Sequence, residues 1–136
     1  MDISKKCAVM IALVIVVIAG IAAVPSLPNE YKNLKVLPKD ISTKDLSRIM
    51  IDEFEDGLGV SCGFCHAEEK DSHKLDYASD EKPEKEIARL MMKMTLEINE
   101  KYFIVTHPLM GDSTLSITCI TCHNGQPRPG GAGQVQ

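Results

Sequence analysis

The chain has 136 residues, of which 44% are hydrophobic and only 4% aromatic, and its formal net charge is −4 at pH 7. This length sets an upper limit of one domain, and the scarcity of aromatic side chains limits the core that the chain can build by itself. The excess of acidic residues argues against a nucleic-acid partner. It suggests partners with a basic docking face, and ordinary solubility explains it equally well.

Residues 7–24 form an uncharged, apolar run of eighteen residues that follows Lys5 and Lys6. A basic flank before an apolar run is typical of a signal peptide or of a membrane anchor, and a run of this length is near the lower limit for crossing a bilayer. Its length and its Ile and Val content favour an uncleaved anchor. We therefore expect residues 1–24 to place the rest of the chain outside the membrane, either anchored there or soluble after cleavage at residue 22 or so.

Three prolines mark residues 25–40 as an extended linker: Pro25, Pro28 and Pro38. Proline restricts both itself and the residue before it to extended conformations, which suits a tether. The domain itself is expected at residues 41–129. The tail at residues 130–136 lacks apolar anchors and should be disordered.

A first helix is expected to begin after Ser42 or Thr43 and to end near Gly57. Asp45 stands three residues after Ser42, in a pattern that resembles a capping box. One face of this helix is apolar except for a single glutamate, and should meet the core or a bound cofactor. The residues of this face are Leu46, Ile49, Met50, Glu53 and Phe54.

A five-residue motif then follows, Cys-Gly-Phe-Cys-His at residues 62–66, and it returns as Cys-Ile-Thr-Cys-His at residues 119–123. Two thiols at this spacing each add to one vinyl group of a haem, and the adjoining histidine then lies where it can bind the iron. The sequence therefore predicts two covalently bound haem c groups. The expected attachment residues are Cys62, Cys65, Cys119 and Cys122, and the expected proximal iron ligands are His66 and His123.

Cysteine pairs at this spacing also occur in zinc sites and in redox dithiols. Only four residues of the chain are histidine, yet one directly follows each pair. Residues 66–118 separate the pairs, far more than the about 15–20 residues of a zinc ribbon. Covalent haem is therefore the favoured interpretation, an all-cysteine zinc site comes next, and a redox dithiol is the least favoured.

Two polar or irregular segments lie between the motifs. Residues 67–82 are expected to form a surface loop and residues 100–116 an irregular connection with turns. Each contains one further histidine. We expect His73 to be solvated rather than bound to iron. His107 is a candidate iron ligand, and the alternative is a surface residue that precedes Pro108.

The clearest helical pattern runs from Pro83 to about Asn99, with Ser79 or Asp80 as the expected cap. Its apolar stripe, within an arc of about 100°, consists of Ile87, Leu90, Met91, Met94 and Ile98. This stripe should face the core or a haem, whereas Met92 points away from it. A methionine stripe usually means core packing, but a short domain with few aromatics must cover two large rings. Periodicity does not choose between Met91 and Met94 as a ligand.

A helix, a turn and the haem motif, occurring twice, resemble the tetrahaem cytochrome subunit of bacterial photosynthetic reaction centres. The match covers residues from about 33 to 129, and its most specific piece is residues 88–99 followed by residues 118–123. In that family the helix before each motif supplies a methionine as the distal iron ligand. The resemblance thus implies that Met50 binds the iron of the haem at Cys62, and that Met91 binds the iron of the haem at Cys119.

The chain departs from that family in having two motifs where the family has four, and in a longer loop before Cys119. The overall expectation is a mainly α-helical, small multihaem c-type cytochrome that relays single electrons between redox proteins or to a membrane electron-transfer complex, in the periplasm or at its membrane. It is expected not to be an enzyme. The alternative is a dihaem peroxidase or a haem-based sensor, in which one iron has an open distal site.

Overall fold

The computed structural model describes residues 10, 11 and 31–130. Nearly all of the predicted export segment at residues 1–24, the first part of the linker at 25–30 and the tail from 131 lie outside the described residues. Among the residues that the structure does describe, no helix is long and apolar enough to cross a membrane.

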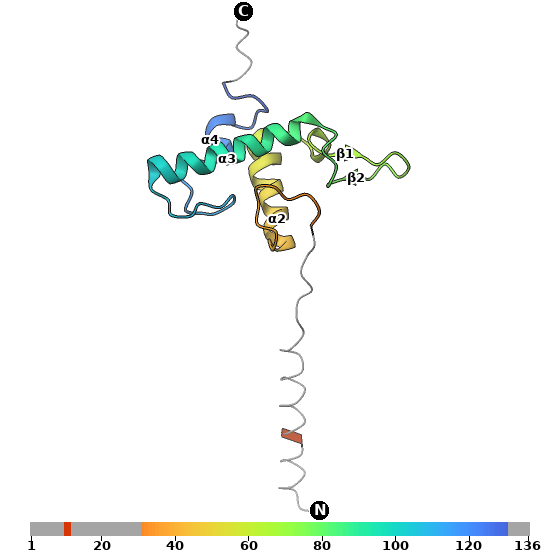
Figure 1. Ribbon diagram of the computed structural model, residues 1–136, viewed down its shortest axis with the longest axis horizontal. Coiled ribbons are helices and arrows are strands. Elements are labelled where there is room, and N and C mark those ends of the chain that lie inside the picture. The colour runs from red at the N-terminus through yellow and green to blue at the C-terminus, as the bar shows by residue number, and fades with distance from the viewer. Residues whose placement is uncertain (1–9, 12–30, 131–136) are drawn as a thin grey trace, which may run out of the picture.

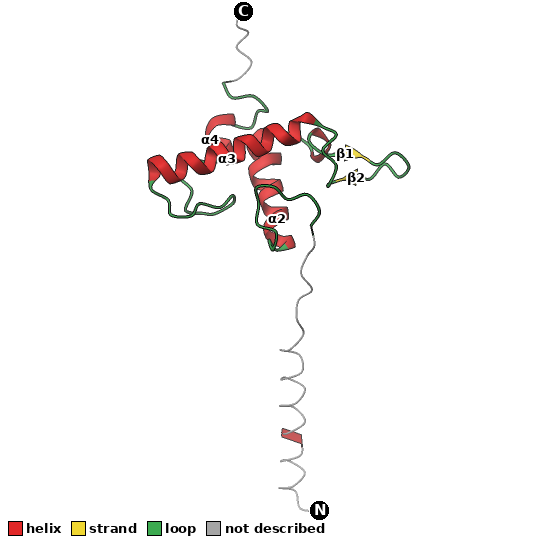
Figure 2. Ribbon diagram, in the orientation of Figure 1, coloured by secondary structure: helices red, strands yellow, loops and turns green. Residues whose placement is uncertain are grey.

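The described part of the chain is mainly helical, as predicted (Figures 1 and 2). Its elements in chain order are α2 (Thr43–Ile49), the π-helical turn η1 (Met50–Asp56), the 3-10 turn η2 (Cys62–Phe64), β1 (Ala67–Glu68), β2 (Leu75–Asp76), α3 (Pro83–Phe103) and α4 (Cys119–His123). The long helix α3 extends across the molecule, and α2 lies at a steep angle to α3 (Figure 1). Helix α4 contacts η1.

The first helix begins at Thr43, as the capping pattern predicts. The Ser42 hydroxyl accepts a hydrogen bond from the Asp45 amide at 3.1 Å, which satisfies one of the free donors at the helix start. The helix continues without a break into the wider turn η1, and Gly57 caps its end. The predicted apolar face is confirmed, because Ile49 is buried and Leu46, Met50 and Phe54 pack partly buried against the core.

The segment predicted to be a surface loop at residues 67–82 contains a short hairpin. Strand β1 pairs antiparallel with β2, with Ala67 opposite Asp76 and Glu68 opposite Leu75. His73 lies in the connection between the strands at a positive φ of 54°, and its side chain is 91% exposed. The expected solvation of His73 is therefore confirmed, and a strand pair too short to show a sequence period was missed.

Helix α3 begins at Pro83, and its cap is Lys82 rather than Ser79 or Asp80, so that part of the prediction was wrong. The carboxylate of Asp80 is instead engaged by Arg89 at 2.9 Å and Lys35 at 2.8 Å. Proline has no N–H group, so a helix that begins with proline has one fewer unpaired donor at its start. A side-chain cap is therefore less necessary.

The other end of α3 also differs from the prediction. The helix ends at Phe103 rather than near Asn99, and Ile104 follows it in the left-handed conformation, donating its amide to the Asn99 carbonyl. Residues 100–103 therefore belong to the helix, and the irregular segment begins after them.

The face of α3 that turns towards the protein is not the predicted apolar stripe. Its buried residues are Arg89, Met92, Thr95 and Asn99. Met92 is only 5% exposed, whereas Met91 and Met94 are 39% and 45% exposed. The expectation that Met92 lies on a different face from the stripe is confirmed, but the stripe does not form the core, and Met92 does.

The core is small. Its buried members are Leu37, Ile49, Met92, Met110 and Cys119. They come from the segment before α2, from α2, α3 and α4, and from the segment between α3 and α4, so the core joins parts of the chain that are far apart in sequence. So few buried apolar side chains contribute little burial energy to set against chain entropy.

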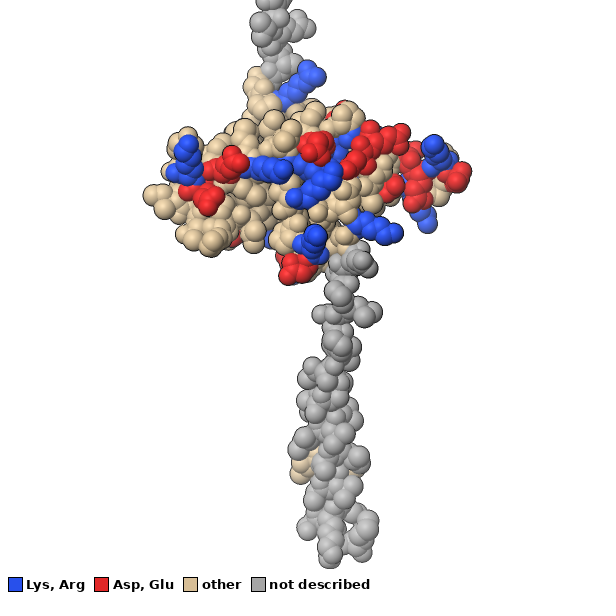
Figure 3. Space-filling model, in the orientation of Figure 1, with Lys and Arg blue, Asp and Glu red and all other residues tan. Residues whose placement is uncertain are grey.

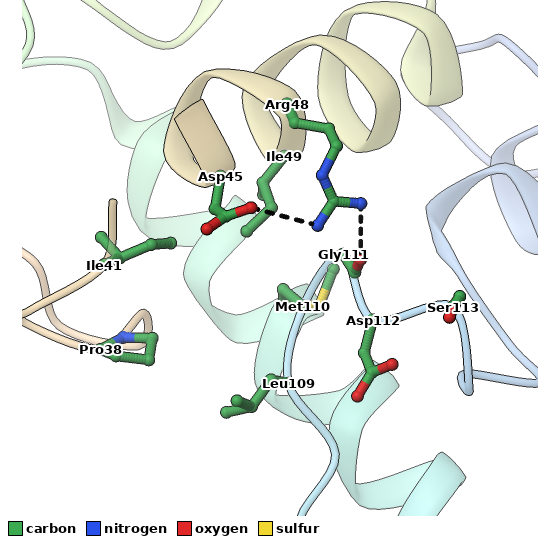
Figure 4. Close-up of a pocket in the computed structure, with 10 residues that line it drawn as sticks. All are labelled: Pro38, Ile41, Asp45, Arg48, Ile49, Leu109, Met110, Gly111, Asp112 and Ser113. Carbon is green, nitrogen blue, oxygen red and sulfur yellow. Dashed lines mark hydrogen bonds and ion pairs between the residues drawn. The ribbon is translucent and has the colours of Figure 1, made fainter. Parts of the chain in front are cut away.

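The segment between α3 and α4 is fixed against α2 by Arg48, whose guanidinium donates to the Gly111 carbonyl at 2.8 Å (Figure 4). A pocket of about 370 Å3 lies between the start of α2, Pro38 and residues 109–113. The haem motif residues do not line this pocket, and Gly111 approaches Ile49 so closely that a Cβ atom there would collide with it.

Candidate haem-binding sites

The first three residues of the first motif form the turn η2, and Cys65 follows as its C-terminal cap. The His66 amide donates to the Cys62 carbonyl at 3.1 Å, closing the turn. Cys62 is exposed and Cys65 half-buried, and both are free thiols. Burial, followed by the negative charge of Glu84, raises the pKa of the Cys65 thiol.

The imidazole of His66 lies edge-on to the Tyr77 ring, with ring centroids 5.0 Å apart. Burial lowers the pKa of His66, and the positive charges of Lys85 and Arg89 lower it further. The neutral ring, which is the form that binds metals, is therefore favoured. The Nδ1 atom of His66 is buried and has no hydrogen-bond partner among the described residues, so a group other than these must complete its environment.

A network of charges holds the surroundings of His66 in place. The Asp80 carboxylate binds Arg89, Lys35 and Lys85, at 2.9, 2.8 and 3.4 Å. Lys85 also donates to the Tyr77 carbonyl at 2.8 Å, which ties the end of the hairpin to the first turn of α3. Figure 3 shows the charged side chains of both signs gathered along α3 and the hairpin.

The second motif forms the short helix α4. Its first cysteine, Cys119, is buried in the core, and Cys122 is exposed. The Nδ1 atom of His123 lies 2.9 Å from the Gln126 carbonyl oxygen. A carbonyl only accepts hydrogen bonds, so Nδ1 carries the proton in the neutral ring and the lone pair of Nε2 is left available for a metal.

Two side chains from other elements fix the start of α4. The Glu53 carboxylate, in η1, accepts the Cys119 amide at 3.1 Å. Asn99 of α3 is completely buried and binds the backbone of Ser116 and Ile117 just before the motif. Burial, followed by the charge of Glu53, raises the pKa of the Cys119 thiol to about 12.

Sequence reasoning gave no role to Glu53 or to Asn99. The sequence did hold a signal for Glu53, which is the single charged residue on an otherwise apolar helix face and so needed a partner. Asn99 carried no comparable signal, because it stood where the helix was expected to end and where an asparagine is common.

The candidate distal ligands lie on two different helices. Met50 is the first residue of η1, and it is half-buried against the core. Met91 lies on the exposed apolar face of α3 together with Met94. His107, the remaining histidine outside the motifs, is exposed and has a positive φ of 53°.

The alternative chemistries find little support in this geometry. Among residues 31–130, no three His, Cys, Asp or Glu side chains are grouped so that they could hold a metal ion. The pKa values of the Cys65 and Cys119 thiols are raised, so neither of these two thiols is held as the thiolate that a redox dithiol uses for attack.

Comparison with known proteins decides the family. The model of the family described as photosynthetic reaction centre cytochrome C subunit matches residues 15–132. The chain belongs to this family. It is therefore a c-type cytochrome, and the predicted resemblance is confirmed.

Two curated relatives agree with this result. Cytochrome c-554 of Chloroflexus aurantiacus is 31% identical over 109 residues, which are 80% of this chain and 24% of that protein. The photosynthetic reaction center cytochrome c subunit of Rubrivivax gelatinosus is 32% identical over 107 residues, which are 77% of this chain and 25% of that protein. The chain thus matches about a quarter of the length of each of these relatives.

Proposed function

We propose that this chain is an exported dihaem c-type cytochrome that passes single electrons between redox partners on the outer, periplasmic face of the bacterial inner membrane. The observation that carries the proposal is that two Cys-x-x-Cys-His turns accompany an exposed apolar, methionine-bearing face on α3. A soluble protein rarely leaves such a face open unless something apolar covers it.

The residues of both motifs fit a covalently bound haem. Each motif offers two free thiols at the spacing of the haem vinyl groups. His123 presents Nε2 as an acceptor because its Nδ1 is engaged by Gln126. His66 is held neutral and has a buried nitrogen that no described group satisfies.

A haem c bound at each motif would supply a reversible one-electron couple. Cys62 and Cys65 would attach one haem, and Cys119 and Cys122 would attach the other. His66 and His123 would each bind the iron of the haem at their own motif.

Met50 and Met91 are the proposed distal ligands. A thioether sulfur favours ferrous iron, which raises the potential, and it fills the position that a peroxide or gas would need. The chain is therefore an electron carrier rather than a peroxidase. Met94 shares the face of Met91, and the choice between them rests on the family match.

The partners follow from charge and location. An acidic cytochrome suits redox proteins, or a membrane electron-transfer complex, with a basic docking face, and not nucleic acid. Membership in a reaction-centre cytochrome family supports association with such a complex. The apolar run at residues 7–24 would hold the cytochrome at the membrane.

The deciding experiment counts the haems. The purified protein should carry two acid-stable haems by mass and by pyridine haemochrome absorbance, and carbon monoxide should leave its spectrum unchanged. Replacing Cys62 and Cys65 by alanine should remove one haem, while Cys7→Ala should remove none. A carbon monoxide shift in the wild type would favour the peroxidase or sensor, and retention of both haems in the double variant would refute the assignment of the motif.

A further inference from the structure

Glu53 connects the two halves of the proposed dihaem unit. It lies in η1, three residues after the proposed distal ligand Met50, and its Oε2 accepts the amide of Cys119, the first attachment residue of the other haem, at 3.1 Å. These two residues are 66 positions apart in the chain. A contact from the helix of one haem site thus reaches the backbone of the other.

Further contacts join the end of η1 to the second motif and to the residues after it. The Gly57 carbonyl, at the end of η1, accepts the Gly125 amide at 3.0 Å, and a Cβ atom on Gly57 would lie 3.3 Å from the Cys119 Cβ. Glu53 is only partly exposed. Its charge is therefore less screened than the charge of a fully solvated carboxylate.

We propose that Glu53 is the positioning residue of the second haem and that its carboxylate lowers the midpoint potential of that haem, so that an electron shared by the pair is biased towards the haem at Cys62. The inference rests on the proposed function. The physical reason is Coulombic: a nearby negative charge stabilises ferric iron, which has one more positive charge than ferrous iron.

The charges around the first motif act in the opposite sense. Lys85, Arg89 and Lys82 place positive charge beside His66, and the Asp76 carboxylate opposes them. The side chains of Lys85 and Arg89 are 11% and 8% exposed, whereas that of their shared partner Asp80 is 39% exposed. Less water screens the cations than the anion, so their field favours the reduced state of the first haem.

Glutamine at position 53 separates charge from position. Glu53→Gln keeps a side-chain oxygen that can accept the Cys119 amide but removes the negative charge, whereas Glu53→Ala removes both. Glu55→Gln is the matched control, since Glu55 belongs to the same turn, is exposed, and loses the same charge away from Cys119.

The measurement is a potentiometric titration of the loaded full-length protein, with the two haems assigned in variants lacking one cysteine pair. In Glu53→Gln the ferrous-to-ferric ratio of the Cys119 haem at fixed potential should rise about tenfold, equivalent to an increase of about 59 mV in its midpoint. The Cys62 haem should shift less, and Glu55→Gln should shift neither. Glu53→Ala should in addition alter the far-red magnetic circular dichroism of the Cys119 haem, because the start of α4 loses its anchor.

An unchanged or lowered potential of the Cys119 haem in Glu53→Gln would overturn the inference, as would an equal rise in Glu55→Gln. Failure of the dihaem proposal looks different: the wild type would then carry fewer than two haems. If only the Cys119 haem were present, the midpoint potential of that haem in Glu53→Gln and in Glu55→Gln would still test the inference.

Discussion

The side-chain carboxamide of Asn99 binds both backbone polar groups of Ile117: its Nδ2 donates to the Ile117 carbonyl at 2.7 Å, and its Oδ1 accepts a hydrogen bond from the Ile117 amide at 3.1 Å. It also accepts the Ser116 amide at 2.8 Å and donates to the Thr95 carbonyl at 2.9 Å. One completely buried side chain therefore fastens the residues before the second motif to α3.

Asn99→Ala should destabilise the protein by about 2–4 kcal/mol, because the backbone groups at positions 116 and 117 lose partners in a buried site. The free energy of unfolding in urea measures this, with Glu100→Ala as the control, since Glu100 is the exposed neighbour on the same helix. The control should lie within about 0.5 kcal/mol of the wild type. Equal stability of the two variants would show that water replaces the carboxamide.

Alanine substitutions of the α3 methionines Met91, Met92 and Met94 should differ in their effects on stability and on carbon monoxide binding. Met92→Ala truncates a buried core side chain and should cost about 2–5 kcal/mol, while Met94→Ala, at an exposed position, should cost much less. Met91→Ala should open one iron to carbon monoxide and lower the potential of that haem. Urea unfolding and carbon monoxide difference spectra of the loaded variants give both readouts; carbon monoxide binding in Met94→Ala instead would transfer the ligand role to Met94.

Gly59 has a φ of +65°, and a Cβ atom there would collide with the Gly125 carbonyl just after the second motif. Gly59→Ala should therefore destabilise the protein by more than about 1 kcal/mol, through backbone strain and through displacement of the chain after α4. Gly63→Ala is the control, because nothing lies within 4 Å of a Cβ atom at Gly63. Thermal unfolding of both variants checks the prediction, which fails if they melt together.

Acid should weaken the protein through Asp80. Hydrogen bonds from Arg89, and then from Lys35, hold the pKa of the Asp80 carboxyl well below its ordinary value of 3.8. The unfolded chain therefore takes up this proton at a higher pH than the folded chain. The stabilising contribution is present above pH 3.8 and is lost as the pH falls from there through the folded pKa.

Unfolding free energies of the wild type and of Asp80→Asn should accordingly converge as the pH falls below 4. Asp71→Asn, a change at an exposed aspartate in the hairpin, should instead run parallel to the wild type over the same range. A constant difference between the wild type and Asp80→Asn down to pH 2 would contradict the role given to this carboxylate.

The sequence by itself determined the parts that depend on local chemistry. The start of the first helix at Thr43 follows from the Ser42 and Asp45 pair, because a cap is made by residues three positions apart. The family follows from two five-residue motifs and the methionine-bearing helix, which is why a short chain with little core was recognisable. Local spacing also placed Met92 away from the apolar stripe.

Only the tertiary structure decided which face of α3 meets the protein. Periodicity marks the most apolar face as the inner one, but here the inner face carries Arg89, Met92, Thr95 and Asn99. Every residue of the apolar stripe except the half-buried Ile98 is exposed. Burial of the polar residues Arg89 and Asn99 on this face is not costly, because both side chains are hydrogen-bonded to residues outside their own helix. Arg89 binds Asp80 and the Asn33 carbonyl, and Asn99 binds Ile117. Such pairings depend on distances between remote segments, which no local pattern encodes, and this is also why Glu53 and Cys119 meet only in the folded chain.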